Sequence, residues 1–174
     1  MAETEYLLVD GYNIIFVWPE LSKLAEENLE AARARLTDIL CNYQGWKQCE
    51  LILVFDGYKT KGSPGSVETH HNIEIVYTKE AQTADQFIEL ATRQLGRRRR
   101  IRVATSDGLE QIIVLGGGAE RISAREFREE VRKGEQEIEK HLEANRRKSR
   151  NNLIDNVSPE MAQFLAELRL KEDE

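Results

Sequence analysis

Short apolar runs alternate along the chain with longer segments in which apolar residues recur every three or four positions. The short runs have the length of buried strands, and they lie at residues 6–9, 51–55, 73–77, 101–105 and 119–122. Helical spacing covers residues 21–43 and returns after Thr83, where Phe87, Ala91 and Leu95 share one face. Strands that alternate with helices predict an α/β fold with a central, mostly parallel sheet.

Helix-capping patterns mark the borders of several of these segments. Thr83 with Gln86, Asp107 with Glu110, and Ser123 with Glu126 each fit a capping box. The second would open a short helix to Leu115, and the third a charged helix to about residue 150. Residues 58–72, rich in Gly, Ser and Pro, predict a loop, and Ser158-Pro159 opens a last helix. We expect a domain over residues 1–150 and a C-terminal helix with an acidic tail over residues 151–174.

Three of the predicted strands end on the same dipeptide, Asp-Gly, at Asp10, Asp56 and Asp107. A turn is sufficient to explain any one of these pairs. Parallel strands, however, place all three carboxylates on one edge of the sheet, where ligands bind in open α/β folds. Asp85 lies in the first turn of a helix, and Glu89 follows one turn later on the same face. An acid at that position also complements the helix dipole, so both readings of Asp85 stay open.

Clustered carboxylates repel one another unless a cation compensates them. An all-oxygen ligand set favours Mg²⁺ or Mn²⁺ over zinc. Such an ion lowers the pKa of bound water and stabilises displacement at phosphorus. The residues therefore point to metal-assisted hydrolysis of a phosphodiester.

The motifs Leu8-Val9-Asp10-Gly11-Tyr12-Asn13, Val54-Phe55-Asp56-Gly57, Thr83-Ala84-Asp85 and Thr105-Ser106-Asp107 occur in this order. Together they resemble the NYN branch of the PIN-like nucleases, and more narrowly the bacterial YacP-type family, which includes a ribosome-associated endoribonuclease. The resemblance covers roughly residues 5–150. It implies a PIN-like three-layer α/β/α fold and RNA cleavage that depends on Mg²⁺ or Mn²⁺.

The same resemblance assigns roles to individual residues. Asp10, Asp56, Asp85 and Asp107 match the acidic positions, and Asn13 matches an asparagine that would orient Asp10 or a metal-bound water. Glu89 is added as a metal ligand from helical geometry. The narrower family implies mRNA and the ribosome, including its rRNA, as partners, with cleavage in the A site and no small-molecule cofactor beyond the metal.

Candidate RNA-binding residues lie outside the acidic set. The densest basic run is Arg97, Arg98, Arg99, Arg100 and Arg102, whose positive charge suits phosphate, although a solvated loop is the alternative. Tyr12 and Tyr58 each follow an Asp-Gly pair and would either stack on a base or pack the edge of the sheet. Lys59 and Lys61 could contact phosphate or rRNA.

Charge qualifies the nucleic-acid hypothesis without excluding it. The 174 residues carry 25 Lys and Arg against 31 Asp and Glu, a net charge of −6. The basic excess is concentrated in residues 93–150 and the acidic excess in the rest. This division predicts weak binding to free RNA and recruitment through one basic face. An acidic start, apolar runs too short to cross a membrane and only two cysteines lead us to expect a cytoplasmic protein.

Two other functions compete with the endoribonuclease. A non-catalytic RNA- or ribosome-binding factor could keep the same fold, although all four acidic positions are occupied. A phosphatase with a nucleophilic aspartate would need a second aspartate two residues after Asp10, where the chain has Tyr12.

Overall fold

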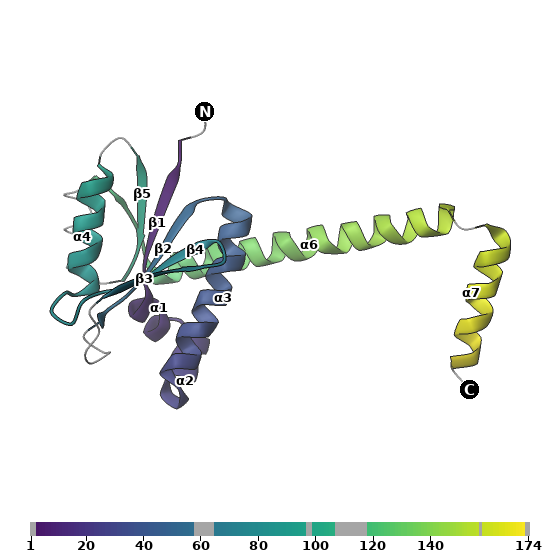
Figure 1. Cartoon of the computed structure of the whole chain (residues 1–174), viewed down its shortest axis with the longest axis horizontal. Coiled ribbons are helices and arrows are strands. Elements are labelled where there is room, and N and C mark those ends of the chain that lie inside the picture. The colour runs from purple at the N-terminus through teal and green to yellow at the C-terminus, as the bar shows by residue number, and fades with distance from the viewer. Residues whose placement is uncertain (1–2, 58–64, 97–98, 107–117, 157, 173–174) are drawn as a thin grey trace. The chain divides into compact units, whose positions relative to one another are not determined.

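The computed structural model describes residues 3–57, 65–96, 99–106, 118–156 and 158–172. Within these residues six strands form one sheet in the order β3-β4-β2-β1-β5-β6 (Figure 1). The strands are β1 (Glu5–Asp10), β2 (Glu50–Phe55), β3 (Ser66–His70), β4 (Ile73–Tyr77), β5 (Arg100–Ala104) and β6 (Glu120–Ile122). All neighbouring pairs are parallel except β3 and β4. The predicted α/β fold with a mostly parallel sheet is confirmed.

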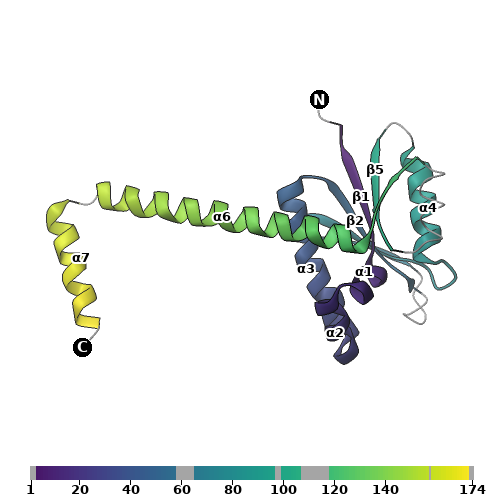
Figure 2. The same cartoon turned by 180° about the vertical axis from the view of Figure 1, so that it is seen from behind.

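Helices cover both faces of this sheet, as Figures 1 and 2 show from opposite sides. One face packs against α1 (Gly11–Val17), α2 (Pro19–Glu27), α3 (Leu29–Lys47) and the start of α6 (Ala124–Asn156), where the larger core cluster lies. The other face packs against α4 (Ala84–Leu95), whose Ala84 and Ile88 join Leu8 and Val54 in a second cluster. Alternate residues of β1 thus serve opposite cores, which makes the three layers of an α/β/α fold.

The single helix expected over residues 21–43 is wrong. Asn28 adopts an extended conformation between α2 and α3, and its Oδ1 accepts a hydrogen bond of 3.1 Å from the backbone amide of Ala31. The asparagine therefore ends one helix and caps the next. Apolar residues recur every three or four positions on both sides of Asn28, because α2 and α3 both pack on the same core, for example through Leu21 and Leu36.

The loop expected over residues 58–72 contains a strand in its described part. Ser66–His70 pairs antiparallel with β4 as the edge strand β3. Four of its five residues are exposed, so β3 lacks the apolar pattern of a buried strand. The hairpin turns at His71, whose φ of 53° lies in the left-handed region.

Two of the predicted capping boxes are confirmed. Thr83 and Gln86 exchange hydrogen bonds of 3.2 and 3.1 Å at the start of α4. Ser123 and Glu126 do the same at the start of α6 with bonds of 3.1 and 2.9 Å. The box at Asp107 and Glu110, with its short helix, lies outside the described residues. The helix that starts after Ser123 runs to Asn156, beyond the expected end near residue 150.

The chain divides into two compact units, Met1–Glu135 and Gln136–Glu174. The first holds the sheet and α1 to α4, and the second holds the remainder of α6 and α7 (Pro159–Glu172). No helix in the described part of the chain is long and apolar enough to span a membrane.

Candidate active site

Asp10 ends β1 and directly precedes α1. Its residue is only 8% exposed, and its side chain makes no capping hydrogen bond to α1. The next residue must be glycine, because a Cβ on Gly11 would lie 2.4 Å from Cε1 of Phe55 and 3.0 Å from the carbonyl oxygen of Val54. The turn after β1 is therefore packed directly against the end of β2, which holds the Asp10 backbone in place.

The second Asp-Gly pair is fixed through Thr78, which is buried. The amide of Gly57 donates to Thr78 Oγ1 at 2.8 Å, and the Thr78 amide donates to the Phe55 carbonyl at 3.0 Å. Thr78 Oγ1 in turn donates to the Gln82 carbonyl at 2.7 Å. A Cβ on Gly57 would lie 1.7 Å from the Thr78 carbonyl oxygen, so glycine is required there too. Thr78 thus joins the end of β2 to the loop that leads into α4.

The register of the sheet places Asp10 and Asp56 at the same edge. Asp10 pairs with Val54 across β1 and β2, so Asp56 comes two residues past the level of Asp10. On the other side Val9 is level with Ala104 of β5. Asp107 follows that strand by three residues and lies outside the described residues.

Asn13 connects the first turn of α1 to the end of β5. Its Oδ1 accepts a 2.8 Å hydrogen bond from the backbone amide of Ser106. Ser106 Oγ accepts a 3.0 Å bond from the amide of Ala124, the first residue of α6. These two bonds hold the residue before Asp107 against α1 and α6. The structure therefore gives Asn13 a backbone partner in addition to the orienting role implied by the resemblance.

Asp85 and Glu89 belong to α4, which packs against β1 and β2. Asp85 is the second residue of the helix, inside the turn closed by the capping box. Glu89 forms an ion pair with Arg93 one turn further on. Asp85 is thus placed beside the strands that carry Asp10 and Asp56, while Glu89 already has a cationic partner.

The acidic side chains supply only oxygen donors, which fits a hard divalent cation. Among the described residues, no group of three or more His, Cys, Asp or Glu side chains is close enough together to hold a metal ion. Asp10, Asp56, Asp85 and Glu89 belong to the described residues and do not form such a group by themselves, whereas Asp107, the third strand-end carboxylate of the proposed set, lies outside them.

Basic side chains of the arginine run lie at the opposite edge of the sheet. Arg100 pairs with Glu5 at the start of β5 and β1. This end of the strands is about one strand length, or roughly 17–20 Å, from the end that carries Asp10. Arg99 donates to Tyr6 Oη at 2.8 Å, and Arg100 pairs with Glu5 at 3.7 Å and Glu120 at 3.4 Å. Arg97 and Arg98 fall outside the described residues.

Arg102 is part of a half-buried network of charged and polar side chains that no sequence pattern predicted. It pairs with Glu130 of α6 at 2.7 Å and with Glu5 at 3.1 Å, and Tyr43 of α3 donates to Glu130 at 2.5 Å. The hydrogen bonds from Arg102, followed by the one from Tyr43, lower the pKa of Glu130 to about 2. Burial first, and then Glu130, raise the pKa of Tyr43. The network connects α6 and α3 to the sheet, and the Arg102 guanidinium is paired with two carboxylates of the protein itself.

Tyr12, a candidate for stacking on a base, is held inside the protein by Phe55 and Arg33. Its ring is buried and packs against Phe55, with 5.2 Å between ring centroids, and its hydroxyl accepts a 2.9 Å bond from Arg33. This favours packing of the edge over stacking on a base. Tyr58, Lys59 and Lys61 lie outside the described residues. Sequence reasoning missed Thr78 and Ser106, because a lone Thr or Ser carries no pattern that reveals its hydrogen-bond partners.

Three comparisons place this arrangement among known proteins. Residues 7–170 match the YacP-like NYN domain family. The uncharacterized protein YacP of Bacillus subtilis (strain 168) is 41% identical over 139 residues, which are 79% of this chain and 81% of that protein. The crystal structure of Rae1 (YacP) from Bacillus subtilis is similar with a TM-score of 0.72 and 35% identity, covering 96% of this chain and 95% of that one. A mutant of Rae1 gives a TM-score of 0.71 and 39% identity, over 81% and 83% of the two chains. The chain belongs to the YacP-like NYN domain family and has its PIN-like fold.

Proposed function

We propose that this protein is a metal-dependent endoribonuclease that cleaves mRNA in association with the translating ribosome, in its A site. The observation that carries the nuclease proposal is the shared edge of Asp10 and Asp56, with Asp85 on the helix beside it. The two strand-end aspartates that the structure describes, Asp10 and Asp56, are each followed by a glycine that the packing requires, at Gly11 and Gly57. The backbone that follows Asp10 and Asp56 is thus held rigidly by its packing, and a catalytic site needs such rigid support.

Asp10, Asp56, Asp85 and Asp107 would hold Mg²⁺ or Mn²⁺, with Glu89 as an additional ligand. When bound, the metal supplies a Lewis acid for the phosphate and lowers the pKa of water. The residues of the chain supply position. The burial of Asp10 and the packing of Gly11 fix one carboxylate, Thr78 fixes the segment after Asp56, and Asn13 fixes the segment before Asp107.

The ribosomal part of the proposal rests on the resemblance of the motifs to the YacP-type family. The arginine run is assigned to rRNA rather than to the cleaved strand, because Arg99 and Arg100 lie at the edge opposite Asp10. Arg102 is left out of this surface, since Glu5 and Glu130 already engage its guanidinium. The cytoplasm follows as the proposed compartment, because translation takes place there.

In vitro translation of a reporter mRNA, with the protein added, tests the ribosomal and nuclease parts of the proposal. We expect cleavage at positions that keep a constant distance to the reading frame. Translation itself needs Mg²⁺, so the metal site is tested through variants of its carboxylates. A one-nucleotide frameshift upstream of the site should move or abolish the cut. Cuts that ignore the frame would refute the ribosomal part, and ribosome binding without any cleavage would favour the non-catalytic factor.

A further inference from the structure

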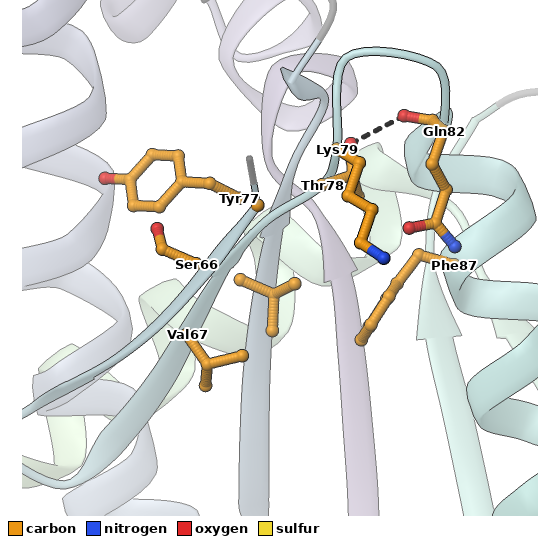
Figure 3. A pocket seen from close by; sticks show the side chains of 9 residues that line it. Ser66, Val67, Tyr77, Thr78, Lys79, Gln82 and Phe87 are labelled. Carbon is orange, nitrogen blue, oxygen red and sulfur yellow. Dashed lines mark hydrogen bonds between the residues drawn. The ribbon is translucent and has the colours of Figure 1, made fainter. Parts of the chain in front are cut away.

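A pocket of about 260 Å³ opens between β4, the edge strand β3 and the start of α4 (Figure 3). Its lining includes Ser66, Val67, Val76, Lys79, Gln82 and Phe87. Thr78, which holds the amide of Gly57, lines the same pocket. Phe87 follows Asp85 by two residues along α4. The pocket is therefore connected to Gly57, the residue after Asp56, through Thr78, and to Asp85 through the first turn of α4.

The pocket lies beside α4, over the part of the sheet formed by β3 and β4. The helix packs against β1 and β2 and buries Ala84 and Ile88 there. Val76 of β4 lies in the same cluster, and its register partner in β3, Val67, stays 67% exposed. Opposite residues of an antiparallel pair point to the same face. Val67 and Val76 thus form an apolar floor beside the helix.

An aromatic wall and a polar mouth complete the pocket. Figure 3 shows the amine of Lys79 extending toward the Phe87 ring, with the Gln82 side chain nearby, and all three residues line the pocket. The stem of Lys79 passes close to Gly65, where a Cβ would lie 2.9 Å from Lys79 Cγ and where φ is +81°. Gly65 is therefore required both by its backbone and by the path of the lysine.

We propose that this pocket binds one unpaired RNA base next to the cleaved phosphate, with Lys79 on the adjoining backbone phosphate. The inference rests on the proposed nuclease function and adds a determinant of nucleotide preference to it. Pockets for drug-sized ligands measure about 300–1,000 Å³, so this one suits a single base rather than two. Flat apolar and aromatic surfaces stack on bases, and a lysine at the mouth attracts phosphate. A pocket for phosphate alone would need no apolar floor.

Binding without metal tests the pocket independently of cleavage. The full-length protein is titrated in EDTA with a short single-stranded RNA that contains 2-aminopurine, and fluorescence quenching is followed. Phe87→Ala should weaken binding by about 5- to 100-fold, the range that one stacked base contributes, and Lys79→Ala should weaken binding and reduce its salt dependence, because one phosphate contact is lost. Phe87→Leu keeps the apolar volume and should fall between Phe87→Ala and the wild type. Leu90→Ala removes an exposed apolar residue of the same helix and is the matched control.

A second RNA, with an abasic site in place of 2-aminopurine, is added as an unlabelled competitor of the fluorescent RNA and separates base from phosphate recognition. It should bind the wild type about 5- to 100-fold more weakly but bind Phe87→Ala as the intact RNA does. Equal affinity of the wild type for both RNAs, or variants at Phe87 and Lys79 that behave like Leu90→Ala, would overturn the base pocket. Absence of cleavage by the wild type with this binding pattern intact would instead overturn the nuclease proposal.

Discussion

The backbone amide of Ser106 donates a 2.8 Å hydrogen bond to Oδ1 of Asn13, although 93 residues separate the two in the chain. The bond joins the helix that follows Asp10 to the residue that precedes Asp107. It gives the asparagine of the first motif a physical task, which is to hold two of the proposed metal-binding segments at a set distance.

Asn13→Ala should therefore lower both stability and activity. The variant leaves the half-buried Ser106 amide without its acceptor, and a typical hydrogen bond of this kind contributes about 0.5–1.5 kcal/mol. Urea unfolding measures the loss. Asn13→Asp keeps an acceptor oxygen at the same place and should restore most of the stability. An Asn13→Ala variant as stable as the wild type would show that the bond contributes nothing.

Gly57→Ala should destabilise the protein by about 1–3 kcal/mol or more, because its Cβ would overlap the Thr78 carbonyl. Gly45→Ala on α3 is the matched control. The nearest atom to a Cβ there is Asn72 Nδ2, at 3.9 Å, and alanine is favoured in a helix by about 0.5–1 kcal/mol. Urea unfolding of both variants should therefore give changes of opposite sign. A stable Gly57→Ala protein would contradict the tight joint between β2 and β4.

Acid should weaken the fold through Glu130. Its pKa in the folded protein is about 2, below the ordinary 4.5, so its stabilising contribution is present above about pH 5. The contribution is lost as pH falls toward 2, because the unfolded state then binds the proton more readily. Thermal unfolding between pH 6 and pH 3 should show a steeper loss of Tm for the wild type than for Glu130→Gln. Glu129→Gln, an exposed neighbour, should retain the slope of the wild type.

The arginine run predicts a salt effect on ribosome binding. Each arginine that contacts phosphate adds about one to the slope of log affinity against log salt concentration. Arg99→Ala with Arg100→Ala should reduce that slope by about two. Arg102→Ala should instead destabilise the fold, by less than the about 3–5 kcal/mol of a fully buried ion pair, because Glu5 keeps Arg100 and Glu130 keeps Tyr43 and Lys47 as partners. An unchanged slope in the double variant would remove the run from the ribosomal surface.

Local patterns predicted what depends on neighbours in the chain. The buried runs gave the parallel strands, and Thr83 and Ser123 gave helix starts, since capping involves residues three apart. Patterns failed where the partner is distant or where burial is slight. Asn28 interrupts a helix whose apolar spacing continues, and β3 is stabilised by pairing with β4 rather than by its own side chains.

In the candidate site, too, the sequence predicted the features that follow from local pattern and missed those that depend on distant partners. The Asp-Gly pairs indicated the shared edge of Asp10 and Asp56, because a parallel sheet aligns its strand ends. Charge alone suggested that Arg102 binds RNA, whereas the fold places Glu5 and Glu130 around it. The partners of Thr78 and Ser106 could not be predicted, since each hydrogen bond closes across the assembled sheet.

Cleavage of a ribosome-bound mRNA by Asp→Asn variants tests the central claim most directly. Asp10→Asn and Asp85→Asn keep the size of each side chain but remove its charge, and Asp38→Asn changes an exposed aspartate of α3 in the same way. With Mg²⁺ or Mn²⁺ present, the first two should each reduce the cleavage rate by at least about 100-fold, while Asp38→Asn cleaves like the wild type. Full cleavage by folded Asp10→Asn and Asp85→Asn would contradict catalysis at the carboxylate edge.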